Sequence, residues 1–70
     1  MALPSAGLKE VDALILKAVE LGLAFPLGVK RWELLNWASE ALELQRRDST
    51  AFQRDGFRKI TMEHFPTANR

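Results

Sequence analysis

A chain of 70 residues with 47% apolar side chains is long enough for one domain with a small core and too apolar for a disordered segment. It contains no cysteine, which excludes disulfides, thiolate metal sites and cysteine nucleophiles. The net charge of +1 is unevenly spread, because residues 46–70 carry six Lys or Arg against three Asp or Glu, whereas residues 1–45 carry four against six. We expect a single domain over residues 1–70, with frayed ends at about 1–5 and 66–70.

Nothing in the sequence indicates export or a membrane span. The N-terminus lacks the charged start and the apolar run of a signal peptide. The longest stretch without a charged residue, LGLAFPLGV, is nine residues and is interrupted by proline and glycine. We therefore expect a cytoplasmic protein with no membrane contact.

The first helix is predicted over about residues 7–21, with Gly22 as its stop. Its apolar residues cover an arc of roughly 220°, interrupted only by Asp12, whereas about 100° is enough to face one core. We therefore expect this helix to contact neighbours on two sides. The arc contains Leu8, Val11, Leu14, Ile15, Leu16, Ala18, Val19 and Leu21.

The segment GLAFPLG is predicted to be a turn, because glycines flank Pro26 and proline disfavours helical angles at the preceding Phe25. Leu23, Phe25 and Leu27 are expected to fold back over the helix ends.

The second helix is predicted over about residues 29–47. One apolar arc of roughly 180° on this helix is expected to face the core. It contains Trp32, Leu34, Leu35, Ala38, Ser39, Ala41 and Leu42.

The third helix is predicted over about residues 51–64. Thr50 followed by Gln53 fits a capping box, and Asp48 and Ser49 are competing caps. Gly56 costs about 1 kcal/mol in a helix relative to Ala, so we expect it to allow another helix to approach closely. The inner face is predicted to contain Phe52, Gly56, Phe57 and Ile60. The fold class is therefore all-α, a compact three-helix unit.

Trp37 falls outside the apolar arc of the second helix, five positions after Trp32. With Leu44 it forms a narrow apolar stripe beside Glu33 and Glu40. An exposed tryptophan rimmed by charges is typical of binding hot spots, so these four residues are predicted to contact a partner. The alternative is that the turn or the N-terminal segment covers Trp37 within the monomer.

Residues with catalytic potential are sparse. His64 is the only histidine, which excludes a site with several histidine ligands, and it is expected to be a half-buried structural residue near a helix end. We expect no catalytic residues, no metal, no cofactor and no enzymatic activity. Arg46, Arg47, Arg54 and Arg58 form a basic set that is predicted to contact phosphates or an acidic partner.

The segment KAVELGLAFPLGVKRWELLNW resembles a helix-turn-helix DNA-binding unit through Ala18, Gly22 and the VKRW that enters the second helix. The resemblance implies that the second helix lies in the major groove. Glu33, Glu40 and Glu43 on the outward side of this helix would repel phosphate. DNA binding is therefore the second-ranked function.

The segment LGLAFPLGVKRW also resembles part of the helical C-terminal domain of 3-hydroxyacyl-CoA dehydrogenases. The matching positions are Leu21, Gly22, Phe25, Pro26, Gly28 and Trp32. This resemblance implies a helical fragment of such an enzyme, although the chain has no room for a nucleotide-binding domain.

The leading interpretation is a small, non-enzymatic helical protein-binding module. We expect an accessory, regulatory or inhibitory protein, a class that includes proteins carried by phages and plasmids, and one that binds itself or a larger partner. The helix-turn-helix regulator and the enzyme fragment remain the alternatives.

Overall fold

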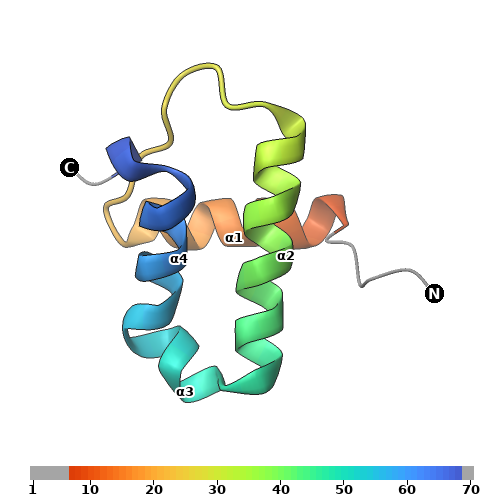
Figure 1. Cartoon of the computed structure of the whole chain (residues 1–70), viewed down its shortest axis with the longest axis vertical. Helices are drawn as coiled ribbons and strands as arrows, with labels where there is room; N and C mark the ends of the chain where they lie inside the picture. The colour runs from red at the N-terminus through yellow and green to blue at the C-terminus, as the bar shows by residue number, and fades with distance from the viewer. Residues whose placement is uncertain (1–6, 69–70) are drawn as a thin grey trace.

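The computed structural model describes residues 7–68 and confirms an all-α unit of three helical segments (Figure 1). Helix α1 spans Leu8–Glu20 and helix α2 spans Arg31–Arg47. The third segment is continuous and consists of α3 (Ser49–Ala51), the π-helical turn η1 (Phe52–Gly56) and α4 (Phe57–His64), followed by the 3-10 turn η2 (Pro66–Ala68). The described residues contain no strand.

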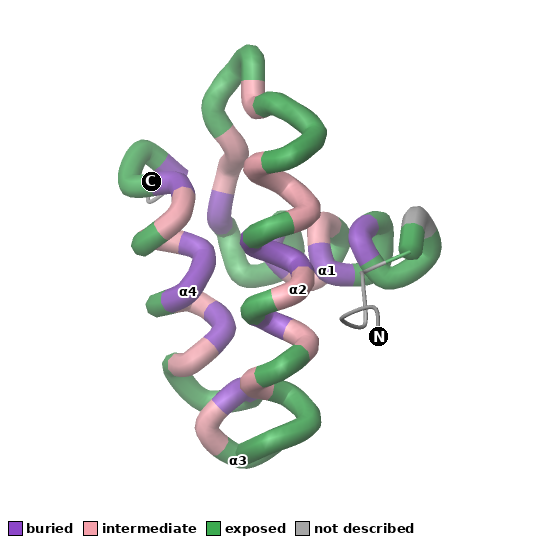
Figure 2. Tube along the Cα trace, turned by 45° about the vertical axis from the view of Figure 1, so that its right-hand side comes forward, coloured by how far each residue is buried: buried purple, intermediate pink, exposed green. Residues whose placement is uncertain are grey.

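Helices α2 and α4 form an antiparallel hairpin, and α1 crosses it on one side (Figure 1). The buried stretches of the three helices face one another in the interior (Figure 2). Three alanines of α1 and α2 are fully buried, and aromatic rings of α2, α4 and the turn that follows α1 contact one another. The core consists of Val11, Leu14, Ala18, Leu23, Trp37, Ala38, Ala41, Phe52, Phe57, Ile60, Phe65 and Ala68.

The turn between α1 and α2 depends on two glycines. Gly22 and Gly28 have φ angles of 82° and 80°, a region that residues with a Cβ rarely adopt. Leu23 is buried and Phe25 packs on the core, as the sequence predicted. Leu27 is fully exposed instead, because it lies at the tip of the turn, where no other part of the fold reaches it.

The π-helical turn explains how the third helix fits the core. The predicted Thr50–Gln53 capping box is wrong, because the helix already begins at Ser49. The competing cap Asp48 is the observed one, since its Oδ1 accepts a hydrogen bond from the Ala51 amide at 3.1 Å. Phe52 and Phe57 are five positions apart, which in an α-helix separates them by about 140°. The Phe57 amide instead bonds to the Phe52 carbonyl, and the wider turn brings both rings into the core, 5.3 Å apart.

Gly56 lies where this turn meets α2. A Cβ built on Gly56 would lie 2.5 Å from Cδ2 of Leu44 and 2.7 Å from the Ala51 carbonyl oxygen. The prediction that Gly56 permits a close helix approach is therefore confirmed.

Residues 66–68 were expected to be frayed, and for these three residues the prediction is wrong. Ala68 is buried, and its carbonyl accepts a hydrogen bond from the Ala24 amide at 2.9 Å. Phe65 directly before this turn is also buried. The predicted frayed residues 1–5 and 69–70 lie outside the described part of the chain.

Candidate interaction surfaces

The two tryptophans have the reverse of their predicted positions. Trp37 is 0% exposed and belongs to the core, whereas Trp32 is 60% exposed. The prediction that Trp37 lies on the surface and contacts a partner is therefore wrong. The alternative is correct in that Phe25 of the turn covers Trp37, with ring centroids 5.1 Å apart.

The prediction was wrong about which side of α2 faces the core. Leu34, Ala38 and Ala41 form a strip that both arrangements share, and it is flanked by two apolar edges of similar character. Trp32 lies on one edge and Trp37 on the other. Compared with the predicted arrangement, α2 is rotated about its own axis by about one residue step, roughly 100°, so that the Trp37 edge faces the core.

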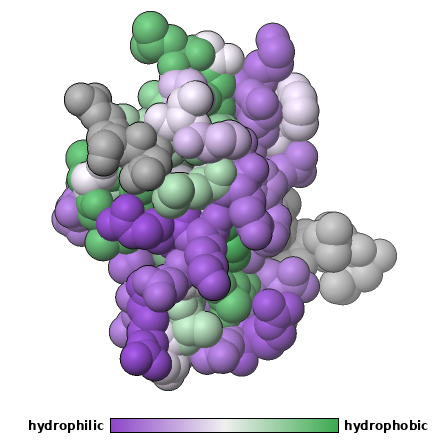
Figure 3. All heavy atoms as spheres, turned by 60° about the vertical axis from the view of Figure 1, so that its left-hand side comes forward, coloured by the Kyte–Doolittle hydropathy of each residue, from purple (hydrophilic) through white to green (hydrophobic). Residues whose placement is uncertain are grey.

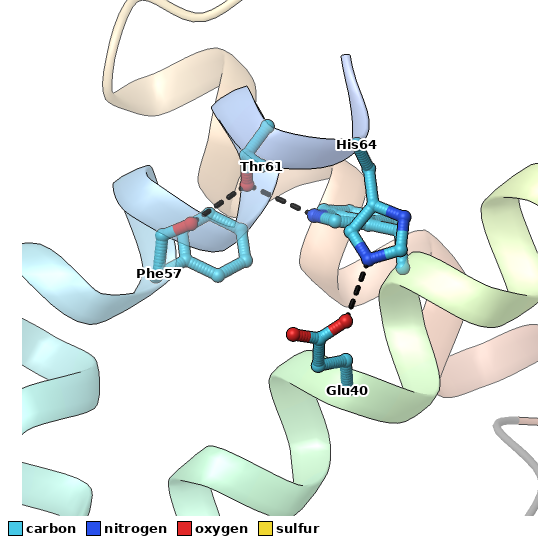
Figure 4. Close-up of polar contacts among 5 residues, drawn as sticks. Glu40, Phe57, Thr61 and His64 are labelled. Atoms are coloured by element: carbon cyan, nitrogen blue, oxygen red, sulfur yellow. Dashed lines mark hydrogen bonds and ion pairs between the residues drawn. The ribbon is translucent and has the colours of Figure 1, made fainter. Parts of the chain in front are cut away.

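Thr61 provides the hydrogen-bond acceptor that the buried indole of Trp37 needs. The Trp37 indole Nε1 donates a 2.9 Å hydrogen bond to Oγ1 of Thr61, and that hydroxyl donates to the Phe57 carbonyl at 2.8 Å (Figure 4). Thr61 is itself fully buried. The rings of Phe57 and Phe65 lie 5.8 and 6.0 Å from that of Trp37. The polar end of the indole is thus satisfied without water.

The two glutamates beside Trp37 have partners within the fold. Oε1 of Glu33 accepts a 2.8 Å hydrogen bond from the Lys30 amide and so caps the start of α2. Oε1 of Glu40 lies 2.7 Å from Nε2 of His64 and joins α2 to the end of α4 (Figure 4). His64 is half-buried at the last position of α4, as predicted.

Four predicted site residues do come together. Glu40, Leu44, Arg46 and Arg47 line one open groove of about 580 Å³ at the boundary of α2 and α4. Charged groups of both signs surround a small apolar floor in this groove, and neither sign dominates. The remaining lining residues are Ser39, Glu43 and Ile60.

The other predicted basic residues are not part of that groove. Arg54 is exposed on η1. Nη2 of Arg58 donates a 3.1 Å hydrogen bond to the carbonyl of Leu21, at the C-terminal end of α1. Arg58 therefore fastens α4 to α1, and the predicted phosphate contact has no structural support at this residue.

The outer face of α1, which lies opposite its buried face, exposes large apolar side chains. Leu16 is 59% exposed and Val19 is 57% exposed, while Val11, Leu14 and Ala18 on the opposite face are buried. Hydrophobic side chains also reach the surface at several places in the space-filling view (Figure 3). The wide apolar arc predicted for the first helix indicated such a second apolar side, although Leu16 and Val19 were not predicted as site residues.

Within residues 7–68, no cluster of three or more His, Asp or Glu side chains is placed to hold a metal ion. Among the same residues, no helix combines the length and apolar character that a bilayer crossing requires.

Comparison of the chain with protein-family models, with curated proteins and with solved structures gave no match. The two local resemblances of the sequence gain no support from it.

Proposed function

We propose that this chain is a small, non-enzymatic protein-binding module and that its contact surface is the outer face of α1. One observation carries the proposal: Leu16 and Val19, one helical turn apart, are both more than half exposed on the same face. Single exposed apolar residues are ordinary, but adjacent ones on a helix form a patch that water solvates poorly.

These two side chains can supply part of a binding free energy. Full burial of a Leu or Val side chain contributes about 1.5–3 kcal/mol. Since more than half of each side chain is exposed, a partner that covers both would gain roughly 2–3 kcal/mol from these two residues. The inner face of α1 already packs against the core, so the outer face is available without unfolding.

The 70-residue chain, immobilised and exposed to proteins of its native host, tests the proposal. We expect Leu16→Glu and Val19→Glu each to reduce the amount of partner that the chain retains by at least tenfold. Leu27→Glu is the matched control, because it places the same charge on a fully exposed leucine outside this face. Equal loss with Leu27→Glu, or no loss with either α1 variant, would reject the surface.

The DNA-binding alternative is tested with the same protein. Fluorescence anisotropy with duplex DNA should show only weak binding that falls steeply with salt. Sub-micromolar binding to one duplex over others at physiological salt would replace protein binding with DNA recognition.

A further inference from the structure

The exposed stripe along α1 has a charge pattern that complements itself. Lys9, Ala13, Leu16 and Glu20 follow the spacing i, i+4, i+7, i+11 and therefore line up along one side of the helix. All four are exposed. A positive charge stands at one end of the stripe, a negative charge at the other, and a small and a large apolar residue lie between them.

We propose that the partner of this face is a second copy of the chain, bound through an antiparallel pairing of the two α1 helices about a two-fold axis between Ala13 and Leu16. The inference rests on the proposed function and names its partner. With the axis at that midpoint, Lys9 of each copy lies level with Glu20 of the other. Leu16 of each copy faces Ala13 of the other, and the small side chain of Ala13 leaves space for the leucine.

Two other arrangements of the same two helices bring like charges together. A parallel pair places Lys9 opposite Lys9 and Glu20 opposite Glu20. An antiparallel pair centred on Leu16 places Asp12 level with Glu20. Like-charge contacts destabilise a helix pair, whereas the register centred between Ala13 and Leu16 pairs Lys9 with Glu20 twice, so charge favours this register. A two-fold dimer also closes on itself and leaves no open end for further growth.

The size of the contact sets the expected strength. Helix α1 has 13 residues, which gives it a length of about 20 Å. Two helices of this length bury less than a standard stable interface. We therefore expect a reversible dimer with a dissociation constant in the micromolar range or weaker, visible in sedimentation equilibrium at high protein concentration.

Charge exchange tests the pairing. Lys9→Glu and Glu20→Lys should each weaken the dimer about tenfold at low salt, because symmetry places each change in two contacts. The double variant Lys9→Glu/Glu20→Lys should restore the dimer, because both pairs are attractive again. Leu16→Glu should leave a folded monomer, which circular dichroism verifies. A double variant as weak as the single ones would overturn the proposal.

Cross-linking tests the register directly, since the chain has no cysteine of its own. When Lys9→Cys and Glu20→Cys chains are mixed and oxidised, the mixed disulfide should exceed either homodimer disulfide. A predominance of homodimer disulfides would overturn the antiparallel register.

The two proposals fail in different ways. A chain that stays monomeric at millimolar concentration, yet retains a foreign protein through Leu16, overturns the second copy as partner and leaves the binding surface in place. A monomeric chain that retains nothing through this face overturns both.

Discussion

Substitution of the two tryptophans provides the sharpest test of the packing of α2. Trp37 is fully buried, and replacing a buried Trp with Ala costs about 3–5 kcal/mol through lost contacts and the cavity left behind. The change also leaves the Thr61 hydroxyl without the indole donor. A domain of this size has a total stability of about 4–10 kcal/mol, from about 0.05–0.15 kcal/mol per residue. Trp37→Ala should therefore remove a large part of the stability, and it should unfold the protein if the stability lies at the low end of that range.

Trp32→Ala is the matched variant, because it removes the same side chain from the same helix. The ring of Trp32 is 60% exposed, and Ala favours helix, so we expect a loss of about 1 kcal/mol or less. That corresponds to a decrease in melting temperature of at most about 4–8 °C for a domain of this length. The decrease for Trp37→Ala should be about 15 °C or more if a transition survives.

Thermal and urea unfolding followed by far-ultraviolet circular dichroism measures both losses. Fluorescence adds an independent readout, because in Trp32→Phe the only emission comes from Trp37 and should be that of an indole shielded from water. If Trp32→Ala unfolds the chain while Trp37→Ala melts like the unmodified protein, the rotation of α2 described above is wrong.

Three further substitutions test local features. Gly56→Ala should destabilise by about 1–3 kcal/mol in urea unfolding, although Ala usually favours a helix, because its Cβ would overlap Leu44; a gain in stability would contradict the close approach. Thr61→Val should cost about 1–3 kcal/mol by leaving the buried indole N–H of Trp37 unpaired, whereas Thr61→Ser keeps the hydroxyl and should cost less. Asp48→Ala should cost about 1 kcal/mol through loss of the helix cap, and an unchanged melting temperature would show that the cap is dispensable.

The sequence predicted the three helices well, because their boundaries depend on local chemistry. Gly22 ends the first helix through its left-handed conformation, as predicted, and the third helix begins with the side-chain cap of Asp48, which was predicted as a competitor of Thr50. The close approach at Gly56 was also predicted, because a glycine is unfavourable in the middle of a helix unless it serves another purpose such as packing. The π-helical turn was not predicted, since it forms only when Phe52 and Phe57 both find space in the same core.

The buried side of α2 was predicted less well, because a helix with two apolar edges does not reveal which edge faces the core. Charges beside Trp37 suggested a solvated face, yet Glu33 caps its own helix and Glu40 pairs with His64. The partners that bury Trp37 lie elsewhere in the chain, among them Thr61, which is 24 positions away, and no periodicity within α2 contains that information.

Helix α1, like α2, has more apolar surface than one side of a helix can bury, and in α1 the excess remains exposed. One helix that crosses a two-helix hairpin can bury only the side that faces the hairpin, and α1 buries Val11, Leu14 and Ala18 there. Its arc extends well beyond that side, so Leu16 and Val19 stay outside the core whatever the details of packing. The hairpin has no further helix to cover them among residues 7–68. A surface that the domain cannot cover by itself is where a second chain gains most by binding.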